Sequence, residues 1–143
     1  MTIAEYLQAV DKQYRTGIAR EHSYRGDLQQ LLTTLCPGVL VTNEPARIAC
    51  GAPDYILTKK DIPVGYVEAK DINVDIGSKS LKEQFDRYRS ALENLIITDY
   101  LEFRFYKGGE HTTTVRIAEV VNGKIKQLPA EFDKFTALIK DFA

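Results

Sequence analysis

The sequence predicts one α/β domain over residues 1–143, built as a mixed central β-sheet flanked by α-helices. Its length of 143 residues, with 44% hydrophobic and 27% charged residues, is typical of a single soluble globular domain. Apolar residues recur with the helical period in four segments and with a strand-like pattern in six. The order is two helices, three strands, one helix, three strands and one helix, which fits a sheet with helices packed on it.

The four predicted helices begin at recognisable signals. Thr2 and Glu5 have the spacing of a capping box at the start of the first helix, and Ser80 and Glu83 have the same spacing at the start of the third. Pro129 precedes the last helix, as proline often does near a first helical position. The predicted helices span residues 2–15, 21–35, 80–93 and 130–141.

The six predicted strands are short runs rich in apolar residues and separated by turn sequences. Lys107-Gly108-Gly109 and Asn122-Gly123 follow the fifth and sixth strands, and residues 59–63 join the second to the third. The predicted strands span residues 39–42, 54–58, 64–68 or beyond, 95–98, 102–106 and 113–121.

Composition argues against a strongly basic nucleic-acid-binding protein, a membrane protein and an exported, disulfide-bonded protein. The formal net charge of -1 argues against a protein held on nucleic acid by bulk charge, although a basic stripe on one face stays compatible with DNA binding. No apolar run reaches the roughly 20 residues of a membrane span, so no membrane partner is expected. The first residues have no basic flank and no apolar core of the kind found in a secretion signal, so export is not expected. Cys36 and Cys50 lack CxxC spacing, and we therefore expect reduced thiols in a cytoplasmic protein.

Two acidic residues and a lysine are expected to meet on the hairpin formed by the second and third strands. If these strands pair about the centre of their connection, position i lies opposite position 122 minus i, and Asp54 falls opposite Glu68. Opposed side chains have Cβ atoms roughly 4.5–5.5 Å apart. Because strand residues alternate between faces, Glu68 and Lys70 share one face while Val67 and Ala69 point to the other, apolar face.

This arrangement suits a divalent metal ion. Two facing carboxylates repel each other without a counter-charge, and Mg²⁺ prefers oxygen ligands, keeps several waters and bridges to phosphate. Such an ion, for which Mn²⁺ could substitute, would polarise a phosphodiester and lower the pKa of a bound water. Lys70 would orient that water or stabilise negative charge. The alternative is that Asp54 caps a turn while Glu68 and Lys70 form a solvated strand face that binds nothing.

Pro53-Asp54, followed after thirteen residues by Glu68-Ala69-Lys70, resembles the signature of PD-(D/E)XK nucleases. The resemblance implies a restriction-endonuclease-like fold and a catalytic role for the aspartate, the glutamate and the lysine.

Gln84, Tyr88 and Glu21 extend this resemblance to two helices. Gln84 and Tyr88 stand four residues apart, similar to a motif of the exonuclease branch in which both face the active site. Glu21 corresponds to a glutamate that completes the metal ligands in several branches. The resemblance thus implies a catalytic set of Asp54, Glu68, Lys70, Gln84 and Tyr88, with Glu21, Asp54 and Glu68 at the metal. Alternatively, Gln84 and Tyr88 only satisfy each other, and Glu21 only complements the helix macrodipole.

A wider resemblance covers most of the chain and is to the N-terminal endonuclease domain of restriction–modification polypeptides fused to adenine-specific DNA methyltransferases. It implies that DNA is the partner, together with a methyltransferase or recognition domain or subunit. No glycine-rich cofactor loop or Asn-Pro-Pro-Tyr motif is present, so methyl transfer is not expected. The segments that carry the resemblance are residues 21–25, 43–45, 51–54, 65–71, 84–88 and 94–100.

Two function hypotheses follow. The first is a metal-dependent DNA endonuclease in which Arg25 and Arg87 contact phosphates; cutting both strands of a duplex would call for two active sites and hence a homodimer. The second is a catalytically inactive nuclease-fold module that binds DNA or serves assembly, which the near-neutral charge favours. For most of the other cations considered for phosphate contact, a solvated surface role is preferred; they are Arg47, Lys59, Lys60, Lys79, Lys82 and Arg89.

Overall fold

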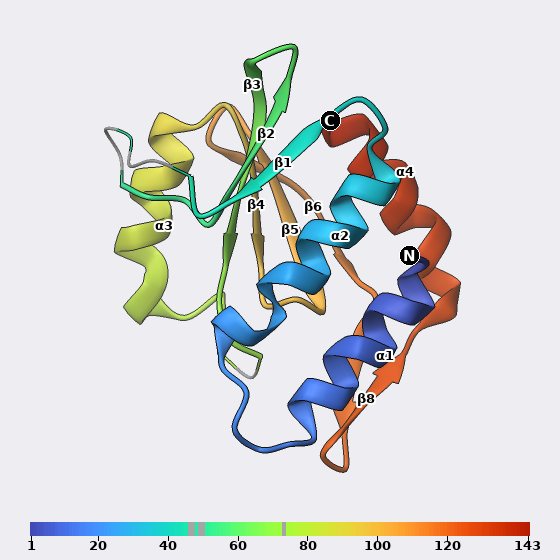
Figure 1. Ribbon diagram of the computed structural model, residues 1–143. Coiled ribbons are helices and arrows are strands. Elements are labelled where there is room, and N and C mark those ends of the chain that lie inside the picture. The colour runs from blue at the N-terminus through green and yellow to red at the C-terminus, as the bar shows by residue number, and fades with distance from the viewer. Residues whose placement is uncertain (46–47, 49–50, 73) are drawn as a thin grey trace.

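The computed structural model describes residues 1–45, 48, 51–72 and 74–143, which form helices around a six-stranded sheet and a separate hairpin (Figure 1). The helices are α1 (Ile3–Tyr14), α2 (Arg25–Leu35), α3 (Lys79–Ala91) and α4 (Phe132–Phe142), with short 3₁₀ turns at Glu21–Tyr24 and Pro129–Glu131. The strands are β1 (Leu40–Asn43), β2 (Tyr55–Lys59), β3 (Ile62–Ala69), β4 (Asn94–Thr98), β5 (Glu102–Lys107), β6 (Glu110–Arg116), β7 (Ala118–Val121) and β8 (Lys124–Gln127).

The large sheet is mixed, and its strands follow one another in sequence order from β1 to β6. β3 and β4 run parallel, and the other described neighbours run antiparallel. A parallel pair needs a crossover connection, and α3 supplies it. The mixed α/β sheet flanked by helices that the sequence predicts is therefore confirmed.

The two faces of the sheet carry different side chains. α1, α2 and α4 lie on one side (Figure 1) and enclose the main core, to which β3 contributes Val67 and Ala69. α3 lies on the other side, where Phe85 packs in a smaller cluster with Ile97 of β4. Because β3 alternates between these faces, Glu68 points to the side that carries α3.

Two predicted local features are wrong. The capping box at the start of α3 does not form, because α3 begins one residue earlier with Ser78 as its N-cap and no side-chain capping bond. The single strand predicted over residues 113–121 is two strands, since Ile117 is fully buried and its N–H donates to the carbonyl of Leu101, which separates β6 from β7. β7 then pairs with β8, a strand that the sequence did not predict.

Other predicted features are present. The Thr2–Glu5 capping box of α1 is formed, and the Asn122-Gly123 turn, with positive φ at both residues, joins β7 to β8. Cys36 is a free, buried thiol, whereas Cys50 and Arg47 lie outside the described residues. Among the helices that the structure describes, none combines the length and hydrophobicity needed to cross a membrane.

Candidate active site

The β2–β3 hairpin sets the register on which the site depends. Tyr55 lies opposite Val67 and Ile56 opposite Tyr66, so the predicted relation of i to 122 minus i is confirmed at this end of the hairpin. A register shift after Leu57 changes the pairing only near the turn. One residue before β2, and thus beside the end of β3, the chain places Asp54 next to Glu68.

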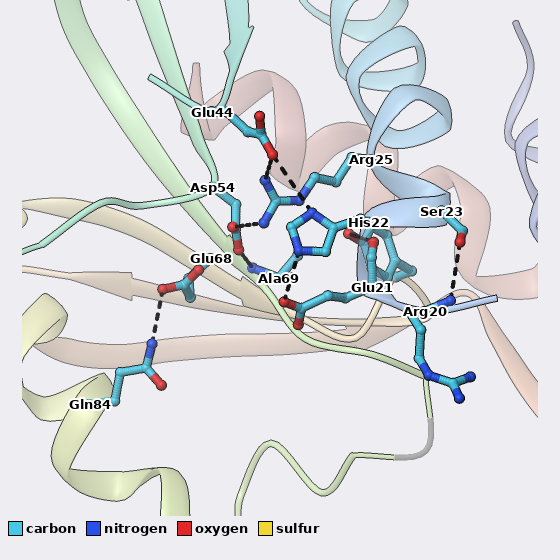
Figure 2. A network of polar contacts seen from close by, with 11 residues as sticks. Arg20, Glu21, His22, Ser23, Arg25, Glu44, Asp54, Glu68, Ala69 and Gln84 are labelled. Atoms are coloured by element: carbon cyan, nitrogen blue, oxygen red, sulfur yellow. Dashed lines mark hydrogen bonds and ion pairs between the residues drawn. The ribbon is translucent and has the colours of Figure 1, made fainter. Parts of the chain in front are cut away.

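Asp54 is buried, with 8% of its surface exposed, and both of its carboxylate oxygens have partners. The backbone N–H of Ala69 donates to Oδ2 at 2.7 Å. The guanidinium of Arg25 donates through Nη2 to Oδ1 (Figure 2). The aspartate is therefore fixed by β3 on one side and by α2 on the other.

Glu68 is the more deeply buried carboxyl, with 3% of its surface exposed. The pKa of Glu68 is raised from 4.5 to about 9, chiefly by burial and in addition by contact with Asp54 and by the negative charge of Asp54. The positive charge of Lys70 and a hydrogen bond from Tyr88 oppose this rise in pKa. The negative charge of Asp54 thus disfavours ionisation of Glu68, as the facing geometry predicts.

Gln84 and Tyr88 both reach Glu68 from α3. Gln84 Nε2 lies 3.4 Å from Glu68 Oε2 (Figure 2), and the Tyr88 hydroxyl is the hydrogen-bond donor that lowers the pKa of Glu68. Their spacing of four residues puts them on one face of the helix. A Cβ on Gly51 would lie 3.0 Å from the Tyr88 hydroxyl, so the glycine leaves room for it. Both α3 residues therefore contact the carboxyl site.

Lys70 follows the last residue of β3 and is half-buried. Its backbone N–H donates to the carbonyl of Thr98 at 2.8 Å, which extends the β3–β4 pairing by one bond. Its ammonium charge is one of the groups that lower the pKa of Glu68. The predicted trio of Asp54, Glu68 and Lys70 is thus brought together at one end of the sheet.

Arg25 sits inside a network of charges rather than on the surface (Figure 2). It is 8% exposed and binds Glu44 through Nη1 at 2.7 Å in addition to Asp54. Its backbone carbonyl accepts a hydrogen bond from the buried Tyr55 hydroxyl at 2.8 Å, which fixes the start of α2 against β2. In this structure the guanidinium joins two carboxylates, and contact with a DNA phosphate stays a prediction.

Among the contacts of the described residues, neither Glu21 nor Arg87 binds the two central carboxylates. The Glu21 side chain is directed to His22, with Oε1 3.7 Å from Nε2, and its backbone carbonyl accepts from the Tyr100 hydroxyl at 2.6 Å. The described residues contain no cluster of three or more His, Cys, Asp or Glu side chains suited to a metal ion. Arg87 is exposed on α3 and lines an open cavity with Lys79.

Sequence reasoning missed the roles of Glu44 and Tyr100. Glu44 follows β1 with φ at 54° and supplies the second carboxylate of Arg25. Tyr100 has φ at 76°, and its N–H donates to Thr98 Oγ1 at 2.9 Å. Its hydroxyl donates to the backbone carbonyl of Glu21. Both belong to segments singled out for resemblance, but positive φ at a non-glycine residue leaves no mark in the sequence.

The central residues fit a divalent cation by their chemistry. Asp54 and Glu68 offer oxygen ligands, and Mg²⁺ is commonly held by one or two carboxylates with waters and substrate phosphate completing its shell. A buried carboxyl with a raised pKa beside another carboxyl is also a place where added positive charge is stabilising. A magnesium ion at this pair would therefore relieve the repulsion between the two carboxyl groups.

Comparison with solved structures supports the fold. A chain in the cryo-EM structure of a DrdV–DNA complex superposes on 98% of this chain with a TM-score of 0.72 and 20% sequence identity. This chain spans only 14% of the length of that chain. No protein-family model matches the sequence, and no match was found among curated proteins. The restriction-endonuclease-like fold class predicted from the sequence is confirmed by this likeness.

Proposed function

We propose that this chain is a metal-dependent DNA endonuclease that hydrolyses phosphodiester bonds, and that residues 1–143 form one PD-(D/E)XK nuclease domain. The observation that carries the proposal is the pair of buried carboxyl groups, Asp54 and Glu68, which lie next to each other and near the charge of Lys70. A buried carboxyl with a strongly raised pKa costs stability in the metal-free protein, and sites of this kind are frequently functional.

The residues of the chain have separate tasks in this proposal. A bound Mg²⁺ or Mn²⁺ would supply Lewis acidity and a more acidic water. Asp54 and Glu68 would hold the ion, and Arg25 and the Ala69 amide keep Asp54 in place. Gln84 and Tyr88 orient Glu68 from α3.

Lys70 would act on the reacting phosphate. Lys70 is half-buried and its positive charge acts on Glu68, so its ammonium would attract a phosphate oxygen bound at the carboxyl pair and stabilise charge that develops during hydrolysis. Glu21 is proposed as an additional ligand that would need to turn from His22 toward the pair. In this proposal Glu21 turns toward the pair only when the metal ion binds, whereas Asp54 and Glu68 are already in place.

DNA is the proposed substrate, and a restriction–modification system the proposed setting. The similar fold belongs to part of a chain in a cryo-EM structure of a DrdV–DNA complex. Since this chain spans a small share of that chain, we propose that a recognition or methyltransferase domain or subunit supplies target specificity. A homodimer would supply the second active site for double-strand cleavage. We also propose a cytoplasmic location.

A plasmid-nicking assay with Mg²⁺ or Mn²⁺ tests the proposal. Asp54→Asn, Glu68→Gln and Lys70→Met should each lower the rate at least a hundredfold, whereas the exposed α4 variant Asp133→Asn should not change it. Equal rates for all five proteins, wild type included, would refute a catalytic role for the carboxyl pair.

A second candidate function is a catalytically inactive module that binds DNA or serves assembly. The observation that favours it is that both oxygens of Asp54 are already satisfied by protein donors. This alternative predicts DNA affinity that is the same in EDTA and in Ca²⁺, and calorimetry should then detect no metal binding that Asp54→Asn abolishes.

A further inference from the structure

A basic cavity lies beside the carboxyl site, on the same face of the sheet. Glu68 of β3 pairs with Ile97 of β4, and Ile97 pairs with Arg104 of β5, so the three side chains form one row across the sheet. Two strand spacings separate the ends of this row, which places Arg104 about 10 Å from Glu68. Figure 1 shows the start of α3 at the same end of the sheet as the end of β3.

The cavity has a volume of about 210 Å³ and opens between the start of α3 and β5. Four cations and one carboxylate line it: Lys79, Lys82, Arg89 and Arg104, with Asp86. Asp86 is already bound by Lys82 at 2.6 Å and by Arg89 at 3.1 Å. Apart from these three residues, the charged lining of the cavity is Lys79 and Arg104, and Arg104 shares the single carboxylate of Glu102 with Arg116.

Arg104 is held in place by a buried carboxylate. Glu102 is 8% exposed and accepts from Arg104 Nε at 2.9 Å and from Arg116 Nη2 at 2.6 Å. One negative charge thus anchors two arginines. The remaining end of the Arg104 fork lies against Gly77, where a Cβ would be 3.1 Å from Nη1, 3.2 Å from Nη2 and 3.4 Å from Asp75 Oδ1, an oxygen that accepts from the Gly77 N–H at 3.0 Å. The absence of a side chain at Gly77 lets the guanidinium reach the loop before α3.

The start of α3 adds to the positive potential. α3 has 13 residues, and the Ser78 side chain makes no capping hydrogen bond to its first turn. Lys79, the first residue of the helix, makes no ion pair among the described residues. The macrodipole of a helix favours anions at its N-terminus, and an arginine fork matches two oxygens of a phosphate.

We infer that the cavity binds a backbone phosphate of the DNA strand that enters the active site, with Arg104 and Lys79 as its main contacts. This inference rests on the proposed function, because it takes the substrate to be DNA. The row from Glu68 to Arg104 gives the substrate a second point of attachment on the same face as the carboxyl pair. Such a contact fixes the position of the strand without reading its sequence.

Fluorescence anisotropy with a labelled 24-bp duplex in EDTA tests the inference. Arg104→Gln should weaken binding about tenfold, and it should reduce the slope of log K against log salt by about one. Lys79→Gln should lower the slope similarly, whereas Lys134→Gln on α4, which removes one exposed charge from the opposite side, should leave both quantities unchanged. Equal affinities and slopes for Arg104→Gln and Lys134→Gln would overturn the inference.

Gly77→Ala provides a variant that keeps every charge but crowds the Arg104 fork, and it should also weaken binding. Melting curves show whether each variant is folded. If stabilisation of the protein by inorganic phosphate depends on Arg104 but binding of the duplex does not, the cavity binds a free anion and the inference fails. Arg104-dependent binding by a protein that cleaves no plasmid would support the inference and refute the proposed nuclease, so the two can fail separately.

Discussion

The cost of keeping Glu68 buried can be measured by replacing it with glutamine. Glu68→Gln keeps the shape of the side chain and removes its charge, so the metal-free variant should be more stable than wild type at neutral pH. The reason is that burial and Asp54 raise the pKa of Glu68 from 4.5 to about 9 in the folded protein. A catalytic carboxylate would then lower the stability of the fold that holds it.

The sign and size of the effect follow from linkage. Between pH 4.5 and pH 9 the folded protein keeps a proton on Glu68 that the unfolded chain has released. Stability contributed by this group is therefore lost as pH rises, at about 1.4 kcal/mol per pH unit. The contribution of Glu68 to the free energy of unfolding of the wild type is therefore about 3 kcal/mol lower at pH 7 than at pH 4.

Urea unfolding in EDTA at pH 5, 6, 7 and 8 measures this loss. The free energy of unfolding of Glu68→Gln minus that of wild type should grow by about 1 kcal/mol or more with each pH unit. Comparing the two proteins at each pH cancels the titration of the other groups. Glu110→Gln, which removes an exposed carboxylate of β6, controls for the change in net charge. A difference that stays constant from pH 5 to pH 8 would show that Glu68 is ionised in the folded protein and would refute the reasoning.

Three further outcomes are expected. Binding of Ca²⁺ at pH 7 should release about one proton, because Glu68 must lose its proton to become a ligand; calorimetry in two buffers of different ionisation enthalpy measures it. Arg25→Gln should lower the free energy of unfolding by about 3 kcal/mol, because it leaves the buried Asp54 without its cation; urea titration measures it. Gly65→Ala should lower the melting temperature, with a cost of about 2 kcal/mol, because the new Cβ would lie 2.5 Å from the Phe142 ring.

Matched variants separate these effects from general damage. Asp54→Asn should abolish the proton release if that release reports on metal binding. Arg15→Gln breaks an exposed ion pair with Asp11 and should cost less than about 1 kcal/mol. Gly26→Ala, in α2 with nothing within 4 Å of the added Cβ, should be neutral or stabilising. If Arg15→Gln lost as much stability as Arg25→Gln, the structural reason given for Arg25→Gln would be contradicted. The same holds for Gly26→Ala compared with Gly65→Ala.

The parts of the fold and site that sequence predicted are those set by local periodicity. Alternation along β3 placed Glu68 on the correct face, and the predicted register is right from Leu57 to Tyr55. The predicted pairing at the turn was wrong, because Lys59 lies opposite Ile62, and a register shift after Leu57 gives the pairing that brings Asp54 beside Glu68. Helical spacing was enough to direct Gln84 and Tyr88 to one face. The break at Ile117 was missed, since nothing in the apolar run from Thr113 to Val121 shows that one residue leaves the sheet to pack in the core.

The parts that sequence did not predict depend on contacts between distant segments. Arg25 was expected at DNA, but α2 docks where its guanidinium meets Asp54, 29 residues away in sequence, and Glu44. The row that joins Glu68 to Arg104 exists only because β3 and β4 run parallel with a particular register. Propensity and periodicity describe one segment at a time, so they carry no information on such long-range partners.

The crossover between β3 and β4 has a consequence for how the site could change over evolution. Glu68, Lys70, Gln84 and Tyr88 all lie within one continuous stretch from the start of β3 to the end of β4, so four of the five proposed catalytic residues belong to a single supersecondary unit. Lengthening the loop between residues 70 and 79 would shift α3 along the sheet. The positions of the Gln84 amide and the Tyr88 hydroxyl relative to Glu68 would then change. The strands themselves, and the aspartate on the neighbouring hairpin arm, would stay where they are.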